Sequence, residues 1–501
     1  MVHNGIIENY AELKGELLLE GCNFFSETDS EVIPHLINKY YEGDFLCAVT
    51  AAIKRLKGSY ALCIMHKNFN GVIAACNKSP VILGYGDGEY FMCSDAPALA
   101  ETSQKISVLC DGDIAVVTEK SVKIYNAKNE LLSRDKVANF ASKACLDLGD
   151  CPHYMLKEMR EVPTAVQNTL SACGALDLQK LRTILTGVDK VVLTGCGTAF
   201  HTCLIARDWI EEFCGIYATA ETAGEWRYKK SPINDKTLVV AVSQSGETAD
   251  TLEAAKLAKS CGAKVLAVTN VGYSAITRVA HFTIPVVAGA EICVAATKSY
   301  CAQLISLWFL TSVLQNINGC ASDKLFKRTH TMPELCQKTL QNLCIDSLCE
   351  QIKNAHGVYF IGRGLDCAVA REGSLKLKEV SLKPGEGYAA GELKHGTLAL
   401  IDKNTYTIAV LCDENLCEKT LSAIKQITAR GGKVAAVCSV KSFIKKLKEV
   451  CDYVIQIPEC DRALSPIISV LPLQYIAYKV AVLCGCDPDK PRNLAKSVTV
   501  E

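Results

Sequence analysis

The chain has 501 residues, of which 49% are hydrophobic and 22% are charged, a composition that favours a globular protein with several buried cores and excludes a disordered chain. Its 54 basic and 54 acidic residues cancel, which argues against a nucleic-acid partner and favours a small-molecule substrate. The longest apolar stretch, 304–314, is too short to span a membrane and the N-terminus does not resemble a signal peptide, so we expect a cytoplasmic protein.

Residues 1–140 predict an α+β domain with an antiparallel sheet, because strand-like runs alternate with turn signals. These runs are YALCIMHK, GVIAAC, PVILGYG and EYFMCSD. A polar, helix-rich segment follows, and we expect it to be a linker over residues 141–180.

The segment TLVVAVSQSGETADT, which starts at Thr237, indicates a phosphate-binding turn. Residues 238–242 read as a buried parallel strand, and the helix that follows the turn is expected to stop at Gly262. Between them lie Ser243, Gln244, Ser245 and Thr248, whose donors would join the free N–H groups of a helix N-terminus. The alternative is that Ser243 and Ser245 are ordinary helix N-caps.

A weak internal repeat covers the rest of the chain. VVLTGCGTA at 191–199 is echoed by VYFIGRGLD at 358–366, and CGAKVLAVTN is echoed by RGGKVAAVCS. Each copy alternates strands and helices, so we predict two doubly wound α/β domains with parallel sheets, over residues 181–325 and 345–501. The second copy has LCDENLC in place of the phosphate turn, and its two acids would repel a phosphate.

The 27 cysteines are scattered without paired CxxC spacing, and no His lies in a metal-ligand motif. In a large cytoplasmic chain such cysteines are mostly small core residues. We therefore expect no metal and no organic cofactor.

Several motifs together resemble the glutamine–fructose-6-phosphate aminotransferase (isomerising) family, and the resemblance covers nearly the whole chain. They are VHNGIIENY, SETDSEVI, HYMLKEM, GCGTAFH, SQSGETADT, EGSLKLKEVS, YAAGELKHG and the C-terminal PRNLAKSVTVE. The resemblance implies two sugar isomerase (SIS) domains behind an N-terminal-nucleophile glutaminase domain. It also implies that fructose 6-phosphate becomes glucosamine 6-phosphate with nitrogen from glutamine, the entry to amino-sugar synthesis.

The resemblance implies a substrate pocket in the first repeat. By similarity, the sugar phosphate is held by Ser243, Gln244, Ser245 and Thr248, with Thr198 at the same pocket and backbone groups of Val294 and Ala295 nearby. Members of the family commonly have serine where this chain has Ala199 and Ala296. We expect that difference to shift affinity rather than abolish the chemistry.

The resemblance also implies the catalytic residues. Lys496 would condense with the C2 ketone as a Schiff base, although its position alone suggests a solvated tail lysine. Glu379 would move a proton between C1 and C2, with Lys376 one helical turn away, although the spacing alone suggests a surface ion pair. His395 would open the sugar ring and would come from a second subunit, which implies a homodimer.

The N-terminus departs from the family pattern. Asn4 and Gly5 match the oxyanion-hole residues and Asp29 matches the carboxylate that grips the glutamine amino group. The family's N-terminal cysteine nucleophile has no counterpart, and Cys22 is the first cysteine. We therefore expect the glutaminase half to be inactive in this chain, because of either a wrongly chosen start or a real truncation.

Two other functions stay open at this point. One is a sugar-phosphate isomerase or deglycase that does not use glutamine, which the presence of Glu379, His395 and Lys496 would allow. The other is a non-catalytic sugar-phosphate sensor, which those same residues disfavour.

Overall fold

The computed structural model describes residues 1–139, 147–317 and 324–498, so the first part of the expected linker, 141–146, lies outside the described residues. The chain divides into two compact units, each described here by itself. The first contains residues 1–147 with short pieces at Glu247–Ala249 and Val498, and the second contains the remaining residues from Leu148 to Ser497.

The first unit has the predicted α+β architecture with antiparallel sheets. One sheet has the strand order β1-β2-β3-β7-β8-β9 and the other has β10-β6-β4-β5. The strands are β1 (Val2–Ile7), β2 (Gly58–Ile64), β3 (Val72–Asn77), β4 (Ile82–Tyr85), β5 (Tyr90–Cys93), β6 (Lys105–Val108), β7 (Ile114–Val117), β8 (Val122–Tyr125), β9 (Leu131–Leu132) and β10 (Val137–Ala138). The helices are α1 (Tyr10–Leu19), η1 (Asp29–Glu31), α2 (Val32–Lys39), α3 (Phe45–Ile53) and η2 (Ala96–Leu99).

Alternation along β3 explains how this unit packs. Ile73 and Ala75 join the core beneath α1, α2 and α3, whereas Ala74 and Cys76 join a second core with Leu83 of β4. Successive side chains of a strand point to opposite faces. The larger sheet is therefore covered by helices on one face and by the smaller sheet on the other.

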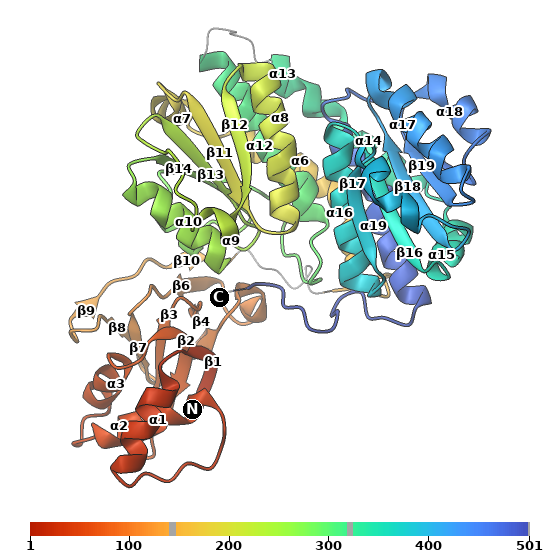
Figure 1. The fold of residues 1–501 in the computed structure, drawn as a ribbon. Coiled ribbons are helices and arrows are strands. Elements are labelled where there is room, and N and C mark those ends of the chain that lie inside the picture. The colour runs from red at the N-terminus through yellow and green to blue at the C-terminus, as the bar shows by residue number, and fades with distance from the viewer. Residues whose placement is uncertain (140–146, 318–323, 499–501) are drawn as a thin grey trace. The chain divides into compact units, whose positions relative to one another are not determined.

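The second unit contains the two predicted parallel sheets, drawn in yellow-green and in cyan-blue in Figure 1. Their strand orders are β12-β11-β13-β14-β15 and β17-β16-β18-β19-β20. The first set is β11 (Lys190–Gly195), β12 (Tyr217–Thr222), β13 (Thr237–Val242), β14 (Lys264–Thr269) and β15 (Phe282–Pro285). The second is β16 (Gly357–Gly362), β17 (Gly385–Ala389), β18 (Thr405–Leu411), β19 (Lys433–Cys438) and β20 (Tyr453–Gln456).

Helices surround both sheets of the second unit. Those of the first repeat are α5 (Tyr154–Arg160), α6 (Val162–Gly174), α7 (Leu178–Leu185), α8 (Thr198–Cys214), α9 (Ala223–Trp226), α10 (Ala249–Ser260), α11 (Ala275–Val279) and α12 (Lys298–Ile317). Those that follow are α13 (Lys324–Lys327), η3 (Arg328–Thr331), α14 (Met332–Gln341), α15 (Asp346–Lys353), α16 (Leu365–Ser381), η4 (Glu392–His395), η5 (Thr397–Leu400), α17 (Glu414–Thr428), α18 (Lys441–Lys448) and α19 (Ser465–Leu483).

One hydrophobic core joins the two repeats. It includes side chains from α8 and α12 of the first repeat and from α16 and α19 of the second. Helices α5 and α6, in the segment 141–180 expected to be a linker, also bury apolar side chains such as Met155 and Val166 in this core. Helix α19 is long and apolar enough to cross a membrane, but most of it is buried inside the protein.

The repeat is visible in the backbone where each first strand turns into its helix. Gly197 and Gly364 precede α8 and α16 with φ angles of 53° and 55°, a left-handed conformation that glycine adopts without strain. A Cβ on Gly362 would lie 2.3 Å from the backbone oxygen of Asp366. These glycines let each helix start directly against the end of its strand.

The second repeat fills its own loop with a carboxyl group. Asp366, on the first turn of α16, is buried, and its Oδ2 accepts the Cys412 N–H at 2.8 Å. Cys412 lies in the segment that replaces the phosphate turn of the first repeat. Burial raises the pKa of Asp366 to about 7, even though the Cys412 N–H opposes that shift.

This buried acid predicts a pH dependence of stability. Because the pKa of Asp366 is raised from 3.8 to about 7 by folding, the free energy of unfolding should fall as the pH rises through that range. D366N mimics the neutral acid and should remove this loss of stability at higher pH. We expect its melting temperature relative to the unchanged protein to be higher at pH 8 than at pH 5. D87N, at an exposed turn, should show no such change between the two pH values.

Candidate functional site

The predicted phosphate turn lies at the carboxyl end of the fully buried strand β13 and leads into α10, as expected. Ser243 Oγ accepts the Gly246 N–H at 3.0 Å, so this hydroxyl closes the turn before α10 begins at Ala249. Gly246 has φ +69°, and a Cβ there would lie 2.0 Å from Ser274 Oγ. Only glycine fits this position, so the backbone of the turn is fixed.

The C-terminal tail lies against this turn. Ser245 Oγ is 3.3 Å from Ser497 Oγ, which places Lys496 beside the loop. Lys496 Nζ donates to Glu291 Oε2 at 3.0 Å and to the Cys293 carbonyl at 2.8 Å. Its side chain is only 25% exposed. Lys496 is therefore not the solvated tail lysine that its position in the sequence suggested.

Asp489 anchors the tail upstream of Lys496. Its two carboxylate oxygens accept the N–H groups of Tyr154 and Met155, both at 2.8 Å, at the start of α5. Its carbonyl accepts the Val294 N–H at 3.1 Å. The Val294 N–H is thus bonded to the tail, while Ala295 is buried beside it.

Two buried carboxyl groups hold the loop from 291 to 299, which carries Val294 and Ala295. Glu291 accepts the N–H groups of Thr297 and Ser299 as well as the Ser299 hydroxyl. Glu158 of α5 accepts the N–H groups of Ile292 and Cys293. Glu291 therefore holds the loop from within, and Glu158 holds it from α5, a helix that is far away in the sequence.

The two acids differ in charge. Burial and the neighbouring Glu291 carboxylate raise the pKa of Glu158 to about 8. Burial alone would also raise the pKa of Glu291, but the Lys496 ammonium and the backbone donors outweigh it and hold that pKa well below its usual range. The two environments therefore favour a neutral Glu158 and an ionised Glu291.

A second polar cluster joins the repeats at α8 and α16. Glu372 is buried between them: its Oε1 accepts the Thr198 hydroxyl at 3.0 Å, and its Oε2 accepts from His201 Nδ1 at 2.7 Å. A carboxylate only accepts, so Nδ1 carries the proton. Lys376 Nζ donates to Thr198 Oγ1 at 2.9 Å and lies 2.5 Å from Glu379 Oε2.

The pair of Lys376 and Glu379 is not a surface ion pair. The Lys376 side chain is 1% exposed and the Glu379 side chain 22%. Burial alone would lower the pKa of Lys376, but the carboxylates of Glu379 and Glu372 outweigh it and raise that pKa. The Glu379 side chain is therefore the partly accessible end of this cluster, while its Oε2 atom is buried against Lys376.

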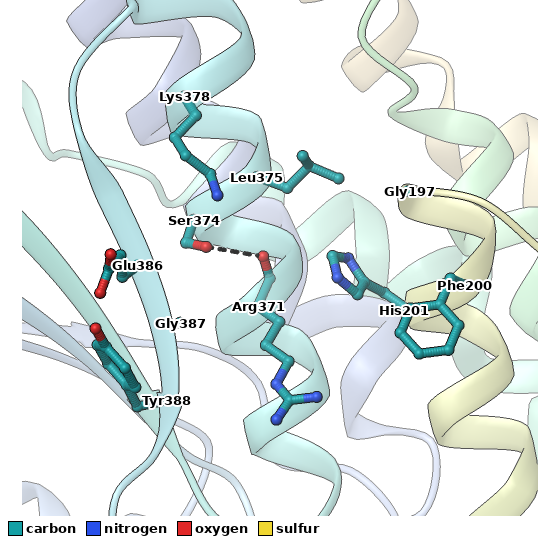
Figure 2. A pocket seen from close by; sticks show the side chains of 10 residues that line it. All are labelled: Gly197, Phe200, His201, Arg371, Ser374, Leu375, Lys378, Glu386, Gly387 and Tyr388. Carbon is teal, nitrogen blue, oxygen red and sulfur yellow. Dashed lines mark hydrogen bonds between the residues drawn. The ribbon is translucent and has the colours of Figure 1, made fainter. Parts of the chain in front are cut away.

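A groove of about 360 Å³, the outer groove, borders the second cluster at His201 (Figure 2). Its lining residues are Gly197, Phe200, His201, Arg371, Ser374, Leu375, Lys378, Glu386, Gly387 and Tyr388. His201 connects the groove to Glu372. None of the residues predicted for substrate binding or catalysis lines it. His395 is exposed at the end of η4, in a single copy of the chain.

The residues matched to a glutamine site lie in the first unit. Asn4 and Gly5 are on β1, where Gly5 has φ +138° and a Cβ would lie 2.1 Å from the Ser59 carbonyl oxygen. Asp29 Oδ2 accepts the Ile7 N–H at 2.7 Å. Their roles toward glutamine stay predictions.

Sequence reasoning missed four members of these clusters, namely Glu158, His201, Glu291 and Glu372. Glu372, Lys376 and Glu379 share one helix face at i, i+4 and i+7, a signal that could have shown a charged stripe. Glu291 lacks such a signal because the loop around it has no periodicity. Glu158 lacks such a signal as well.

Comparisons with known proteins agree with this architecture. The family model of the SIS domain matches residues 184–313 and 351–484, and that of the glutamine amidotransferase domain matches residues 1–101. The C-terminal domain of glucosamine-fructose-6-phosphate aminotransferase from Francisella tularensis covers 69% of this chain and 99% of its own, with 34% identity and a TM-score of 0.65. Tagatose-6-phosphate ketose/aldose isomerase from Escherichia coli shares the fold, with 17% identity over 68% of this chain and 95% of its own and a TM-score of 0.60.

Curated relatives match over the whole chain. The glutamine–fructose-6-phosphate aminotransferase (isomerising) of Caldanaerobacter subterraneus is 40% identical over 100% of this chain and 84% of its own length. The protein of the same name from Aquifex aeolicus is 41% identical with the same coverage. The chain therefore belongs to the glutamine–fructose-6-phosphate aminotransferase (isomerising) family.

Proposed function

We propose that this protein converts fructose 6-phosphate to glucosamine 6-phosphate with nitrogen from glutamine. The observation that carries the proposal is the buried ion pair of Lys376 and Glu379, bonded through Thr198 to the repeat that contains the phosphate turn. It supplies a carboxylate for proton transfer, and the turn after β13 is suited to a sugar phosphate. The names of the relatives support the substrates and product.

In this proposal the second unit carries out the sugar chemistry. Ser245, Gln244 and Thr248 hold the phosphate at the N-terminus of α10, with Ser243 fixing the turn. Lys496 forms a Schiff base with the C2 ketone, and Glu379 transfers a proton between C1 and C2. Thr198 orients Lys376, which stays charged and can stabilise the oxyanion that develops on the substrate.

The remaining parts of the proposal extend beyond a single chain. His395 opens the sugar ring from a second subunit, so the working form is a homodimer in the cytoplasm. Its exposure in one copy is consistent with that assignment. The first unit, which matches the glutamine amidotransferase model, binds glutamine through Asn4, Gly5 and Asp29.

A direct assay tests the sugar half of this function. Purified protein is incubated with fructose 6-phosphate, with and without glutamine, while glucose 6-phosphate and glucosamine 6-phosphate are followed separately. We expect glucose 6-phosphate to form without glutamine, because isomerisation needs only the groups of the second unit. Absence of both products would contradict the proposal. Glucosamine 6-phosphate in the presence of glutamine would confirm nitrogen transfer and contradict the expected inactivity of the glutaminase half, whereas glucose 6-phosphate alone would limit the function to the sugar half.

Phosphate recognition is tested by S245A. Loss of one hydrogen bond to a charged group costs about 1.5–3 kcal/mol, so KM for fructose 6-phosphate should rise by about 10-fold or more while kcat changes less. S374A is the matched control, because Ser374 Oγ bonds to the Arg371 carbonyl in the outer groove (Figure 2). Steady-state kinetics of both variants measure these KM values. A KM of S245A equal to that of S374A and of the unchanged protein would exclude Ser245 from the phosphate site.

Proton transfer is tested by E379Q. Gln keeps the size of the side chain but cannot accept the proton, so exchange of the C1 hydrogen with deuterated solvent should slow by about 10²–10⁴-fold. E386Q, on β17 in the outer groove, should exchange at the rate of the unchanged protein. NMR of the recovered sugar phosphate measures the exchange, and normal exchange in E379Q would refute its role as the base.

A further inference from the structure

Lys496 has two hydrogen-bond partners among the described residues, and only one of these partners can take a proton from it. Nζ donates to Glu291 Oε2 at 3.0 Å and to the Cys293 carbonyl at 2.8 Å. Both partners are acceptors, an arrangement that suits an ammonium, which offers three donors and no lone pair. Such a nitrogen cannot attack a ketone until it loses a proton. A backbone carbonyl does not take that proton, whereas a carboxylate can.

We propose that Glu291 is the catalytic base and acid of Schiff-base formation at Lys496. The inference rests on the proposed function, since it takes Lys496 as the amine that condenses with the substrate ketone. Glu291 touches the reacting nitrogen directly, and its side chain is fully buried. Its other bonds, to Thr297 and Ser299, hold the carboxylate so that Oε2 faces the amine.

The steps balance without a further reactant. The Lys496 ammonium gives one proton to Oε2, and the neutral amine adds to C2, so that a C–N bond forms and the carbonyl electron pair moves to oxygen. A proton then passes from nitrogen to that oxygen to give a carbinolamine. Glu291 returns its proton to the hydroxyl, the C–O bond breaks and water leaves. The products are an iminium on Lys496 and an ionised Glu291, with no oxidation or reduction.

The environment of Glu291 supports both directions of this transfer. The ammonium is the main group that opposes burial and keeps the carboxylate ionised at rest. When the amine becomes neutral, burial remains and favours the protonated acid. Loss of the proton from Lys496 and its retention on Glu291 are therefore coupled.

Glu158 provides an internal contrast. It supports the same loop through Ile292 and Cys293, but its Oε2 has no hydrogen-bond partner among the described residues. Burial and the neighbouring Glu291 raise its pKa, which favours the neutral acid over a base. Two acids whose environments separate their pKa values in this way often divide catalytic roles. Here the ionised one contacts the amine and the neutral one supports the backbone.

The first experiment establishes the imine itself. The full chain is mixed with fructose 6-phosphate and sodium cyanoborohydride, which reduces an iminium to a stable amine but spares the free ketone, and the adduct is located by peptide mass spectrometry. We expect it on Lys496. No adduct on Lys496 in the unchanged protein would overturn the Schiff base of the proposed function, and with it this inference.

The second experiment compares E291Q with E158Q in the same trapping assay. Gln at 291 still accepts hydrogen bonds but has no basic carboxylate, so the rate of adduct formation should fall by about 100-fold or more. Gln at 158 resembles the neutral acid already present, so its rate should stay within about 3-fold. Hexitol 6-phosphate, which has no carbonyl, should bind E291Q with an unchanged Kd, which also shows that the variant is folded.

The outcomes separate chemistry from structure. Normal trapping in E291Q, with an adduct on Lys496, would refute Glu291 as the acid and base while leaving the proposed function intact. Equal losses in E291Q and E158Q, or a weaker Kd for hexitol 6-phosphate in E291Q alone, would mean that Glu291 acts by supporting the loop, and would also refute the inference.

Discussion

The need to satisfy one buried carboxylate, that of Glu372, organises the centre of the second unit. A charge taken out of water is tolerated only when it is paired and hydrogen-bonded. Glu372 meets this requirement with Thr198 and His201 from the first repeat and with Lys376 from its own helix. The α8 and α16 helices are thereby joined by directional bonds as well as by the shared apolar core. The same bonds hold Lys376, and through it Glu379, in a single place.

The loop from 291 to 299 follows the same principle with a different result. Residues 291–297 lie in neither a helix nor a strand, and four backbone N–H groups of the loop are bonded to Glu158 and Glu291. Backbone donors that helix or sheet bonds leave free must find other acceptors when they are buried. A loop held by acids rather than by a ladder of backbone bonds keeps its shape and places charge next to the C-terminal tail. Support and reactivity thus come from the same side chains.

The sequence predicted the architecture because its signals are local. Buried runs such as 238–242 and glycines such as Gly195 and Gly362 are recognised from neighbouring residues alone, and the repeat is the similarity of two such stretches. The turn at Ser243 and the proximity of Lys376 to Glu379 were predicted for the same reason. Glu291 with Lys496, and Glu372 with Thr198, could not be predicted, since they are far apart in the chain and their meaning depends on burial. The segment from 154 to 180 reads as polar and linker-like, yet its apolar faces are covered by the core.

The acid at Asp366 bears on how many ligands each chain can hold. In the second repeat the loop that corresponds to the phosphate turn already has a carboxyl oxygen on its Cys412 N–H. A tethered group acts at an effective concentration that free phosphate esters in solution do not readily match. With the phosphate held by the first repeat as proposed, duplication of the fold would not duplicate the binding site, and one sugar phosphate would serve two similar domains. The second repeat instead supplies side chains such as Glu372 and Lys376, which bond to the first repeat.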